Sequence, residues 1–420
     1  MTTRVCHFDI HVNSRHTGTI HAAECVVLEE DGFVRRVDFR YLPEFALHPH
    51  GFALDPQRLA LGLDEIRFNC QGGMPGFIDD HLPDSWGTKV LAALALHRDG
   101  VRLNRNSAID LLTLLRGKSS IGALSFVPLG QGSPPGPPGF ANVGASIDQL
   151  AMAERAATRI DAVDWSRDTD NIGLAKLAHD GSSIGGARPK ALITDGSNHY
   201  LAKFNRLSGD GYNNARVELA CLNMARAAGL EVTDGKVVAG VNGREALLLR
   251  RFDIDAHRHR RHLVTLNALL KEPATERDSG LRFRYDDVAD VLRSHSVSVQ
   301  ADLAQLARLA LFNRAINNTD DHARNFSLIH DGDGYCLAPA YDLVPNLAFG
   351  EYHAASFGQQ PWPPQPSEMT KVGRIFSLPK AVSQSCAGEV RTAVERWPEF
   401  AEQAGVAEEE CQRIGARFHL

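Results

Sequence analysis

The chain has 420 residues, with 45 basic and 51 acidic side chains and a formal net charge of −6 at pH 7. Its composition, 43% hydrophobic and 23% charged, is that of a globular protein large enough for two or three domains. The acidic balance disfavours nucleic acid as the main ligand, because phosphate binding depends on clustered Lys and Arg side chains.

Two sequence features bear on where the protein works. No run approaches the ~18–20 consecutive apolar residues of a membrane span, and the polar N-terminus lacks the pattern of a signal peptide. The seven cysteines include no C-x-x-C pair, which disfavours a structural zinc site and a disulfide framework. We therefore expect a cytoplasmic protein without a membrane partner.

The patterning along the chain predicts an N-terminal β-rich part followed by a larger second domain. Alternation of polar and apolar residues predicts strands, and apolar residues at helical spacing predict helices. The predicted strands are 4–12 and 24–42, and the predicted helices are 89–98 and 108–117. Residues 130–141 contain four Pro and four Gly, which neither a helix nor a central strand accepts. We predict an N-terminal subdomain over 1–130, a linker over 131–144 and a second domain over 145–420.

A glycine-containing loop opens the most informative part of the second domain. Gly185 and Gly186 precede a predicted strand, 190–194, a turn and a second strand, 199–204. Backbone N–H groups of such a loop are free to hold phosphate oxygens. Lys203 lies in the second strand among apolar neighbours, where a buried ammonium group requires an anionic partner. Taken alone, the pattern favours a surface lysine on an edge strand, because glycine-containing loops are common.

A predicted helix over 213–232 supplies a candidate partner for that lysine. Glu218 lies near the start of the helix, fifteen residues after Lys203, and Gly229 is placed to end the helix within this segment. The same carboxylate would also interact favourably with the helix dipole without any partner. The sequence leaves both interpretations open.

A second predicted helix leads into a polar segment. Apolar residues at Leu303, Leu306, Ala310 and their neighbours predict a buried helix. The loop that follows, 318–325, carries groups that can accept protons or bind metal. These are Asp320, Asp321, His322 and Asn325. A polar turn that ends a helix is the alternative interpretation.

A predicted hairpin follows this loop and ends at another carboxylate. Residues 326–329 and 335–338 are predicted to pair around the turn 331–334. Folding the hairpin about Asp333 and Gly334 would bring Asn325 opposite Asp342. Amide and carboxylate oxygens suit Mg²⁺, which keeps several waters and binds phosphates.

The order of these groups is that of a phosphoryl-transfer site. Protein kinases use a Gly-rich loop, a strand Lys paired with a helix Glu, a catalytic Asp, an Asn five residues later and a metal-binding Asp. Here Asp320 and Asn325 have the five-residue spacing. The usual H-R-D and D-F-G letters are replaced by Asn-Thr-Asp at 318–320 and Tyr-Asp-Leu at 341–343, so an ordinary eukaryotic-type kinase is excluded.

The sequence resembles the HipA family of bacterial serine/threonine kinases, toxins of type II toxin–antitoxin modules. The segments that carry the resemblance are SIGGARPK (183–190), YLAK (200–203), VE (217–218), RFD (251–253), NTDDHARN (318–325), YDLVP (341–345), LPDSWG (82–87) and GAL (122–124). The resemblance covers most of the chain. It implies an α+β, bilobal protein-kinase-like fold with a β-rich N-terminal subdomain, an ATP-binding part at about 170–255 and a mainly helical lobe at about 256–420.

The resemblance also implies functional residues. Asp320 would be the catalytic aspartate, Asn325 and Asp342 the Mg²⁺ ligands, and Glu218 the support of Lys203. The residues implied in ATP binding are Gly185, Gly186, Ala187, Arg188, Pro189, Lys190, Lys203, Arg250, Arg251, Phe252, His322, Arg324, Asn325, Tyr341 and Asp342. The family phosphorylates itself on a serine of the phosphate loop, which corresponds to Ser183, with Ser182 adjacent. A phosphate there adds about −1.5 to −2 charge where ATP phosphates bind.

Partners and substrates follow only from the resemblance. It implies a small helix-turn-helix antitoxin of the HipB type, with DNA contacted weakly or through that partner, and a protein substrate such as an aminoacyl-tRNA synthetase. Two departures are Asp321, where the best-known member has Gly, and the Arg188–Pro189 pair in the phosphate loop. A catalytically weak corepressor and a small-molecule kinase are the alternative functions. The segment 256–262, AHRHRRH, is interpreted as a solvated loop.

Overall fold

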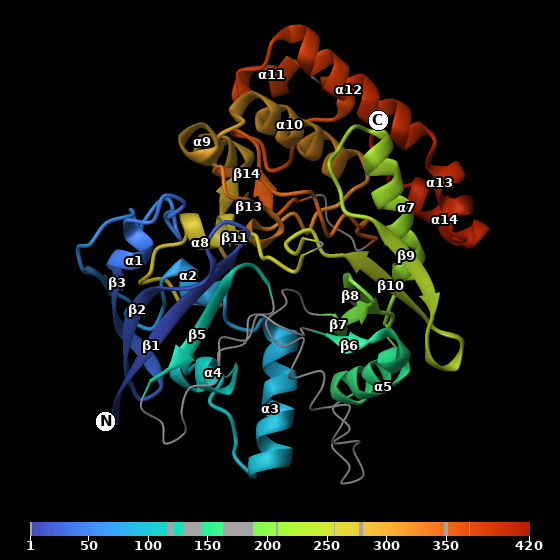
Figure 1. Ribbon diagram of the computed structural model, residues 1–420. Helices are drawn as coiled ribbons and strands as arrows, with labels where there is room; N and C mark the ends of the chain where they lie inside the picture. The colour runs from blue at the N-terminus through green and yellow to red at the C-terminus, as the bar shows by residue number, and fades with distance from the viewer. Residues whose placement is uncertain are drawn as a thin grey trace.

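The computed structural model describes residues 2–115, 121–129, 144–162, 188–206, 209–255, 257–276, 280–347, 352–368 and 370–420. Its elements form a sheet from the N-terminal part, a second sheet from the middle of the chain, and a mainly helical C-terminal part (Figure 1). Apolar side chains from all three parts join in one continuous buried cluster, so the parts share a core. Within the described residues, no helix is both long enough and apolar enough to cross a lipid bilayer.

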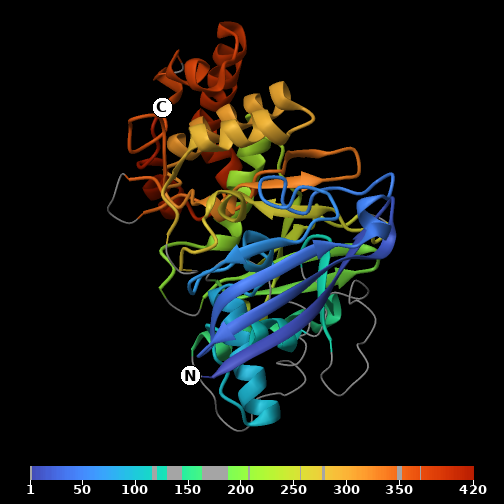
Figure 2. The same ribbon diagram turned by 90° about the vertical axis from the view of Figure 1, so that its left-hand side faces the viewer.

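The N-terminal sheet has five strands in the order β4-β3-β2-β1-β5, each antiparallel to its neighbour. The strands are β1 (Thr3–Ser14), β2 (Gly18–Glu30), β3 (Phe33–Tyr41), β4 (Ile66–Asn69) and β5 (Leu124–Pro128). Phe8, Ile10 and Val12 are fully buried while the residues between them are not, as the alternating sequence predicted. In Figure 2 these strands run across the front, with the C-terminal helices above them.

Four helices accompany this sheet. They are α1 (Pro43–Ala46), α2 (Gly76–Asp79), α3 (Ser85–Asp99) and α4 (Ala108–Leu115). Asp84 caps α3, because its side chain accepts a hydrogen bond from the backbone N–H of Gly87 at 2.7 Å. The predicted helices at 89–98 and 108–117 correspond to α3 and α4.

The second sheet has the strand order β6-β7-β8-β10-β9. Its strands are β6 (Ala145–Ser146), β7 (Lys190–Asp195), β8 (Asn198–Phe204), β9 (Gly235–Ala239) and β10 (Glu245–Arg250), accompanied by α5 (Leu150–Asp161) and α7 (Asn214–Ala227). The turn between β7 and β8 contains Gly196 at φ +60°, a conformation that favours glycine. Helix α7 ends as predicted, with Gly229 in the left-handed conformation two residues after Ala227.

The C-terminal part contains a small sheet, β11-β13-β14, and most of the helices. The strands are β11 (His262–Thr265), β13 (Ser327–His330) and β14 (Tyr335–Leu337), and β12 (Phe283–Arg284) pairs with β15 (Ala355–Ser356). The helices are α8 (Leu266–Leu270), α9 (Tyr285–His295), α10 (Val299–Ala315), α11 (Thr370–Phe376), α12 (Lys380–Glu395), α13 (Trp397–Gln403) and α14 (Glu408–Gly415). The buried helix predicted around Leu303 is α10.

Two sequence predictions need correction. The β13–β14 hairpin pairs Leu328 with Leu337, which centres the turn between Gly332 and Asp333 instead of Asp333 and Gly334. The register of the ladder therefore does not place Asn325 opposite Asp342. The segment 256–262 is only partly a solvated loop, since Arg260 and His262 are 2% and 3% exposed. His262 begins β11, and Arg260 lies 3.8 Å from the Asp253 carboxylate. The predicted linker, apart from Gly144, lies outside the described residues.

Candidate active site

A cavity of about 850 Å³ lies where the three parts of the chain meet. Its wall includes Asp80 and Asp84 from the N-terminal part, Lys203 from β8 and Asp342 from the C-terminal part. Nine of the residues predicted to bind nucleotide line this cavity: Lys203, Arg250, Arg251, Phe252, His322, Arg324, Asn325, Tyr341 and Asp342. The predicted residues are therefore brought together from segments that are far apart in sequence.

Lys203 lies between two carboxylates. Its ammonium nitrogen is 2.6 Å from Oε1 of Glu218, which α7 presents, and it forms a second short ion pair with Oδ1 of Asp342. Although burial opposes ionisation, Lys203 lowers the pKa of Asp342 to about 2, with a smaller contribution from Lys190. Burial raises the pKa of Glu218, which Lys203 partly offsets. The side chain of Lys203 is thus fixed at the cavity wall in its charged form.

Asp342 has an unusual backbone for a residue other than glycine. Its φ is +58°, in the left-handed region that Asp and Asn enter more often than other side chains. Its carbonyl oxygen accepts a hydrogen bond from the side-chain amide of Asn318 at 3.3 Å. This conformation stores strain, which is common where a side chain is aimed at a functional site.

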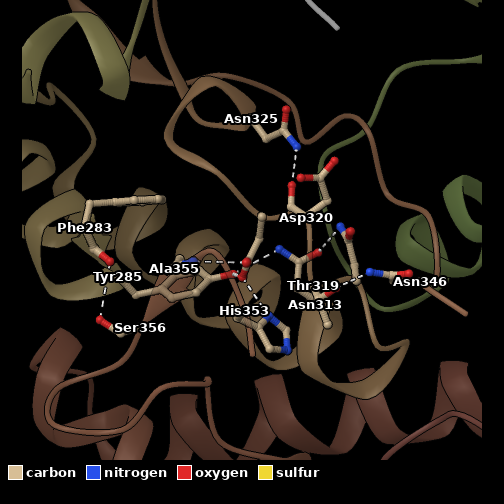
Figure 3. A network of polar contacts seen from close by, with 12 residues as sticks. Phe283, Tyr285, Asn313, Thr319, Asp320, Asn325, Asn346, His353, Ala355 and Ser356 are labelled. Atoms are coloured by element: carbon tan, nitrogen blue, oxygen red, sulfur yellow. Dashed lines mark hydrogen bonds and ion pairs between the residues drawn. The ribbon is translucent and has the colours of Figure 1, made fainter. Parts of the chain in front are cut away.

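Asn325 and Asp320 are directly linked. The side-chain N–H of Asn325 donates to the backbone carbonyl of Asp320 at 2.8 Å (Figure 3). This assignment leaves the amide oxygen of Asn325 available as a ligand, and both Asn325 and Asp342 line the cavity. An amide oxygen and an ionised carboxylate are hard donors, so the residues present fit Mg²⁺.

The carboxylate of Asp320 remains open to solvent. Surrounding protein displaces water from it and raises its pKa, His322 counteracts this, and the charges of Asp342 and Asp321 add to the rise. Asp320 is not among the described residues that line the cavity. Asn325, which does line the cavity, donates to the backbone carbonyl of Asp320, so the exposed Asp320 lies next to the cavity.

Asp321 serves a different purpose from its neighbour. It is 1% exposed and accepts hydrogen bonds from Tyr285 Oη at 2.8 Å, His353 Nδ1 at 2.9 Å and the backbone N–H of Ala355 at 3.1 Å. Figure 3 labels these three partners. These bonds join the loop 318–325 to α9 and β15. The sequence predicted Asp321 as a group that can accept protons or bind metal and gave no sign of this buried anchor.

The segment that joins the two sheets of the second domain is also fixed. Arg251 donates two hydrogen bonds to Asp253, at 2.9 and 2.5 Å, and Asp253 also accepts from the backbone N–H of Gly122 at 2.8 Å. The ring of Phe252 stacks on Tyr341 with a centroid separation of 6.1 Å. Residues 250–252 therefore form a partly apolar part of the cavity wall, which these contacts restrain.

The phosphate loop is described only in part. Gly185, Gly186, Ala187 and the candidate serines, Ser182 and Ser183, lie outside the described residues. Arg188 forms an ion pair with Asp210 at 2.9 Å. Pro189 accepts a backbone hydrogen bond from Phe204. Lys190 is 2% exposed, with its nitrogen 3.6 Å from Asp84, and burial lowers its pKa. These three residues are not among the described residues that line the cavity.

The chain is similar to known proteins in both sequence and fold. Residues 182–418 match the family described as the HipA-like C-terminal domain. Two curated relatives are "Putative kinase Y4mE" of Sinorhizobium fredii, 28% identical over 45% of this chain, and Toxin YjjJ of Escherichia coli, 24% identical over 65% of this chain. The chain covers 40% and 60% of the lengths of these two relatives.

A solved structure matches nearly the whole chain. HipA from the Shewanella oneidensis MR-1 complex of HipA, HipB and operator DNA aligns with a TM-score of 0.67, covering 98% of this chain and 96% of that one at 18% identity. The shared fold confirms the expected α+β, bilobal kinase-like architecture. The family match spans more than half of the sequence, and the chain therefore belongs to the HipA-like C-terminal domain family.

Proposed function

We propose that this protein is an ATP- and Mg²⁺-dependent protein serine/threonine kinase that acts as the toxin of a type II toxin–antitoxin module. The observation that carries the proposal is Lys203, held between Glu218 and Asp342 at a cavity that Asn325 also lines. The names of the relatives, a kinase and a toxin, support the same conclusion.

Each residue has a role that follows from its position. Lys203 would neutralise charge on the ATP phosphates, and Glu218 would hold its ammonium group in place. Asp320, at the open edge of the site, would orient the substrate hydroxyl and accept its proton. Phe252 and Tyr341 would cover the base of the nucleotide. Asn325 and Asp342 would hold Mg²⁺, which would supply positive charge to offset that of the ATP phosphates.

The partners are proposed from the family. The Shewanella HipA was solved with HipB and operator DNA. We infer a helix-turn-helix antitoxin of the HipB type for this chain, with DNA contacted weakly or through that antitoxin. The protein substrate would be an aminoacyl-tRNA synthetase, and the protein would phosphorylate its own Ser183, next to Ser182. A cytoplasmic location fits these partners.

The first experiment is phosphate transfer by the purified protein. Wild type, Asp320→Ala and Ser183→Ala would be incubated with radiolabelled ATP and Mg²⁺, and mass spectrometry would locate the label. Label on Ser183 or Ser182 of the wild type, with a loss of roughly 10²–10⁴-fold in rate for Asp320→Ala, is expected.

Two results would overturn the kinase proposal or narrow it. Absence of transfer to any protein, after phosphatase treatment and repurification, would favour the corepressor alternative. Transfer only to a small molecule would favour the small-molecule kinase. An Asp320→Ala variant with full activity would remove Asp320 from its proposed role.

A further inference from the structure

A short segment of the N-terminal part lies between the two halves of the candidate site. It runs from Asp79, the last residue of α2, to Trp86 in the first turn of α3. Helix α2 lies beside α8 of the C-terminal part (Figure 1), where Asn267 donates to Asp79 at 3.2 Å. At the other end, the Trp86 indole N–H donates to the carbonyl of Lys190 in β7 at 3.1 Å. The segment thus contacts both the helical part and the second sheet.

Two consecutive carboxylates of this segment hold Arg324. The guanidinium Nη2 donates to Asp79 Oδ2 at 2.7 Å, and Nη1 lies 3.7 Å from Asp80 Oδ1. Asp79 is 3% exposed. Burial opposes the charge of Arg324, but Asp79 and Asp80 outweigh it and raise its pKa. Charge-assisted hydrogen bonds of this kind are about twice as strong as neutral ones, so the contact fixes the arginine firmly.

Asp80 also fixes the C-terminal part through a second element. Its two oxygens accept from the backbone N–H and the hydroxyl of Thr265, both at 2.7 Å. Thr265 in turn caps α8 by accepting from the N–H of Ala268 at 3.1 Å. Asp79 and Asp80 together therefore bind the end of β11, the start of α8 and the loop 318–325.

Arg324 connects these contacts to the two residues assigned to Mg²⁺. Arg324 immediately precedes Asn325, and its carbonyl accepts the Tyr341 hydroxyl at 2.8 Å. Tyr341 immediately precedes Asp342. Holding Arg324 therefore restrains both residues assigned to Mg²⁺, although neither Asp79 nor Asp80 is one of those ligands.

We propose that Asp79 and Asp80 are positioning residues of the reaction, through which the N-terminal subdomain holds Asn325 and Asp342 in the geometry that binds Mg²⁺. This inference rests on the proposed kinase function. Asp79 is not among the described residues that line the cavity, so it acts on the site through its partners, of which Arg324 is the one adjacent to Asn325. The residues that hold a metal-binding group typically contribute 10–100-fold to metal affinity or activity.

The test compares Asp79→Asn and Asp80→Asn with wild type in the full-length protein. Asn preserves size and one acceptor oxygen while removing the charge that holds Arg324. The matched control is Glu272→Gln, which removes the ion pair between Glu272 and Arg58, another contact between the N-terminal and C-terminal parts. Asp80→Asn keeps an acceptor for Thr265, so it provides a second, milder variant if Asp79→Asn folds poorly.

Two measurements are made on each variant. Hydrogen exchange of residues 320–326 in nucleotide-free protein reports the restraint of the loop without any need for activity. The Mg²⁺ concentration that gives half the maximal rate of phosphate transfer reports the consequence for the site. We expect faster exchange in 320–326 and at the direct contacts of the two carboxylates in 265–268, with other segments unchanged, and a rise of roughly 10–100-fold in the Mg²⁺ requirement for both Asp variants. Glu272→Gln should match wild type in both measurements.

The outcomes separate this inference from the kinase proposal. Unchanged exchange in 320–326, or an equal effect of Glu272→Gln, would overturn the positioning role even if the protein is an active kinase. If wild type transfers no phosphate, the kinase proposal fails, and the exchange comparison still decides whether Asp79 and Asp80 restrain the loop.

Discussion

The side-chain amide of Asn325 donates to the backbone carbonyl of Asp320 at 2.8 Å, so the two residues form one unit. The five-residue spacing seen in the sequence is thus a consequence of a closed loop. In that loop, the proposed metal ligand and the proposed base cannot move independently. Asp321 anchors the same loop through hydrogen bonds with Tyr285 and His353. These bonds restrain the backbone that carries the exposed Asp320.

The lysine between two carboxylates predicts a coupled effect on stability. Lys203→Met leaves the buried Glu218 and the nearby Asp342 without their shared cation, and it should lower the free energy of unfolding by roughly 3 kcal/mol. That is the lower end of the usual range, because the Asp342 side chain is 38% exposed and water screens its charge. Adding Glu218→Gln should recover part of the loss. Denaturant unfolding of the single and double variants measures this, and strictly additive losses would contradict the coupling.

The raised pKa of Asp320 predicts the acid limb of the rate profile. Displacement of water from its carboxylate, with the charges of Asp342 and Asp321, raises the pKa, and His322 opposes the shift. A general base works only when deprotonated, so kcat should fall toward low pH with a midpoint above about 3.9, the ordinary value for Asp. In His322→Gln the midpoint should move higher. A midpoint at or below 3.9, measured by the dependence of phosphate transfer on pH, would exclude Asp320 as a base with a raised pKa.

Asp321 is buried and is not among the described residues that line the cavity. Its substitution should therefore lower the free energy of unfolding without directly altering the cavity wall. Asp321→Asn places an amide N–H opposite groups that already donate, and leaving such groups unsatisfied costs about 1–3 kcal/mol. Tyr285→Phe removes one of those donors and also the acceptor of Asn313, whose amide lies 3.0 Å away, and should cost about 1 kcal/mol. Thermal unfolding would test both variants. An Asp321→Asn variant as stable as wild type would show that the network contributes little.

The contact between Arg251 and Asp253 predicts an effect on nucleotide affinity. Asp253→Asn weakens the bidentate contact with Arg251 in the segment assigned to the nucleotide base, far from the transferred phosphate. The KM for ATP should rise several-fold while kcat stays nearly unchanged, since the loss affects ground state and transition state equally. Asp234→Asn, which changes a surface ion pair with Arg226, is the control and should match wild type. A fall in kcat with constant KM would contradict this assignment.

Local patterns in the sequence were sufficient for part of the elements. The strand β1, the β7–β8 hairpin and the helices α7 and α10 follow from alternation, helical spacing and glycine positions. The prediction of a strand over 24–42 was wrong in its continuity, because a turn at Asp31 and Gly32 divides the segment between β2 and β3. The Lys203–Glu218 contact could be anticipated because a lysine among apolar residues needs a partner. The hairpin turn was predicted one residue too far along, on Asp333 and Gly334, whereas the observed turn is centred between the two Asp-Gly pairs, at Gly332 and Asp333.

Contacts between distant segments could not be predicted in this way. Asp79 and Arg324 are 245 residues apart, and nothing in the local sequence of either identifies the other. The two consecutive aspartates at 320 and 321 look equivalent in sequence, yet one is exposed and the other buried, because only the packing of α9 and β15 distinguishes them. Arg260 and His262 were misread for the same reason.

The continuous core has a genetic consequence. The family match begins at residue 182, yet the apolar cluster and the cavity wall include side chains from the first 130 residues. Substitutions that abolish the biological effect of this protein should therefore be recovered throughout the N-terminal sheet and its helices as well as in the matched region. A fragment that contains only residues 182–418 would lack part of the cavity wall and would expose apolar surface that the N-terminal residues cover.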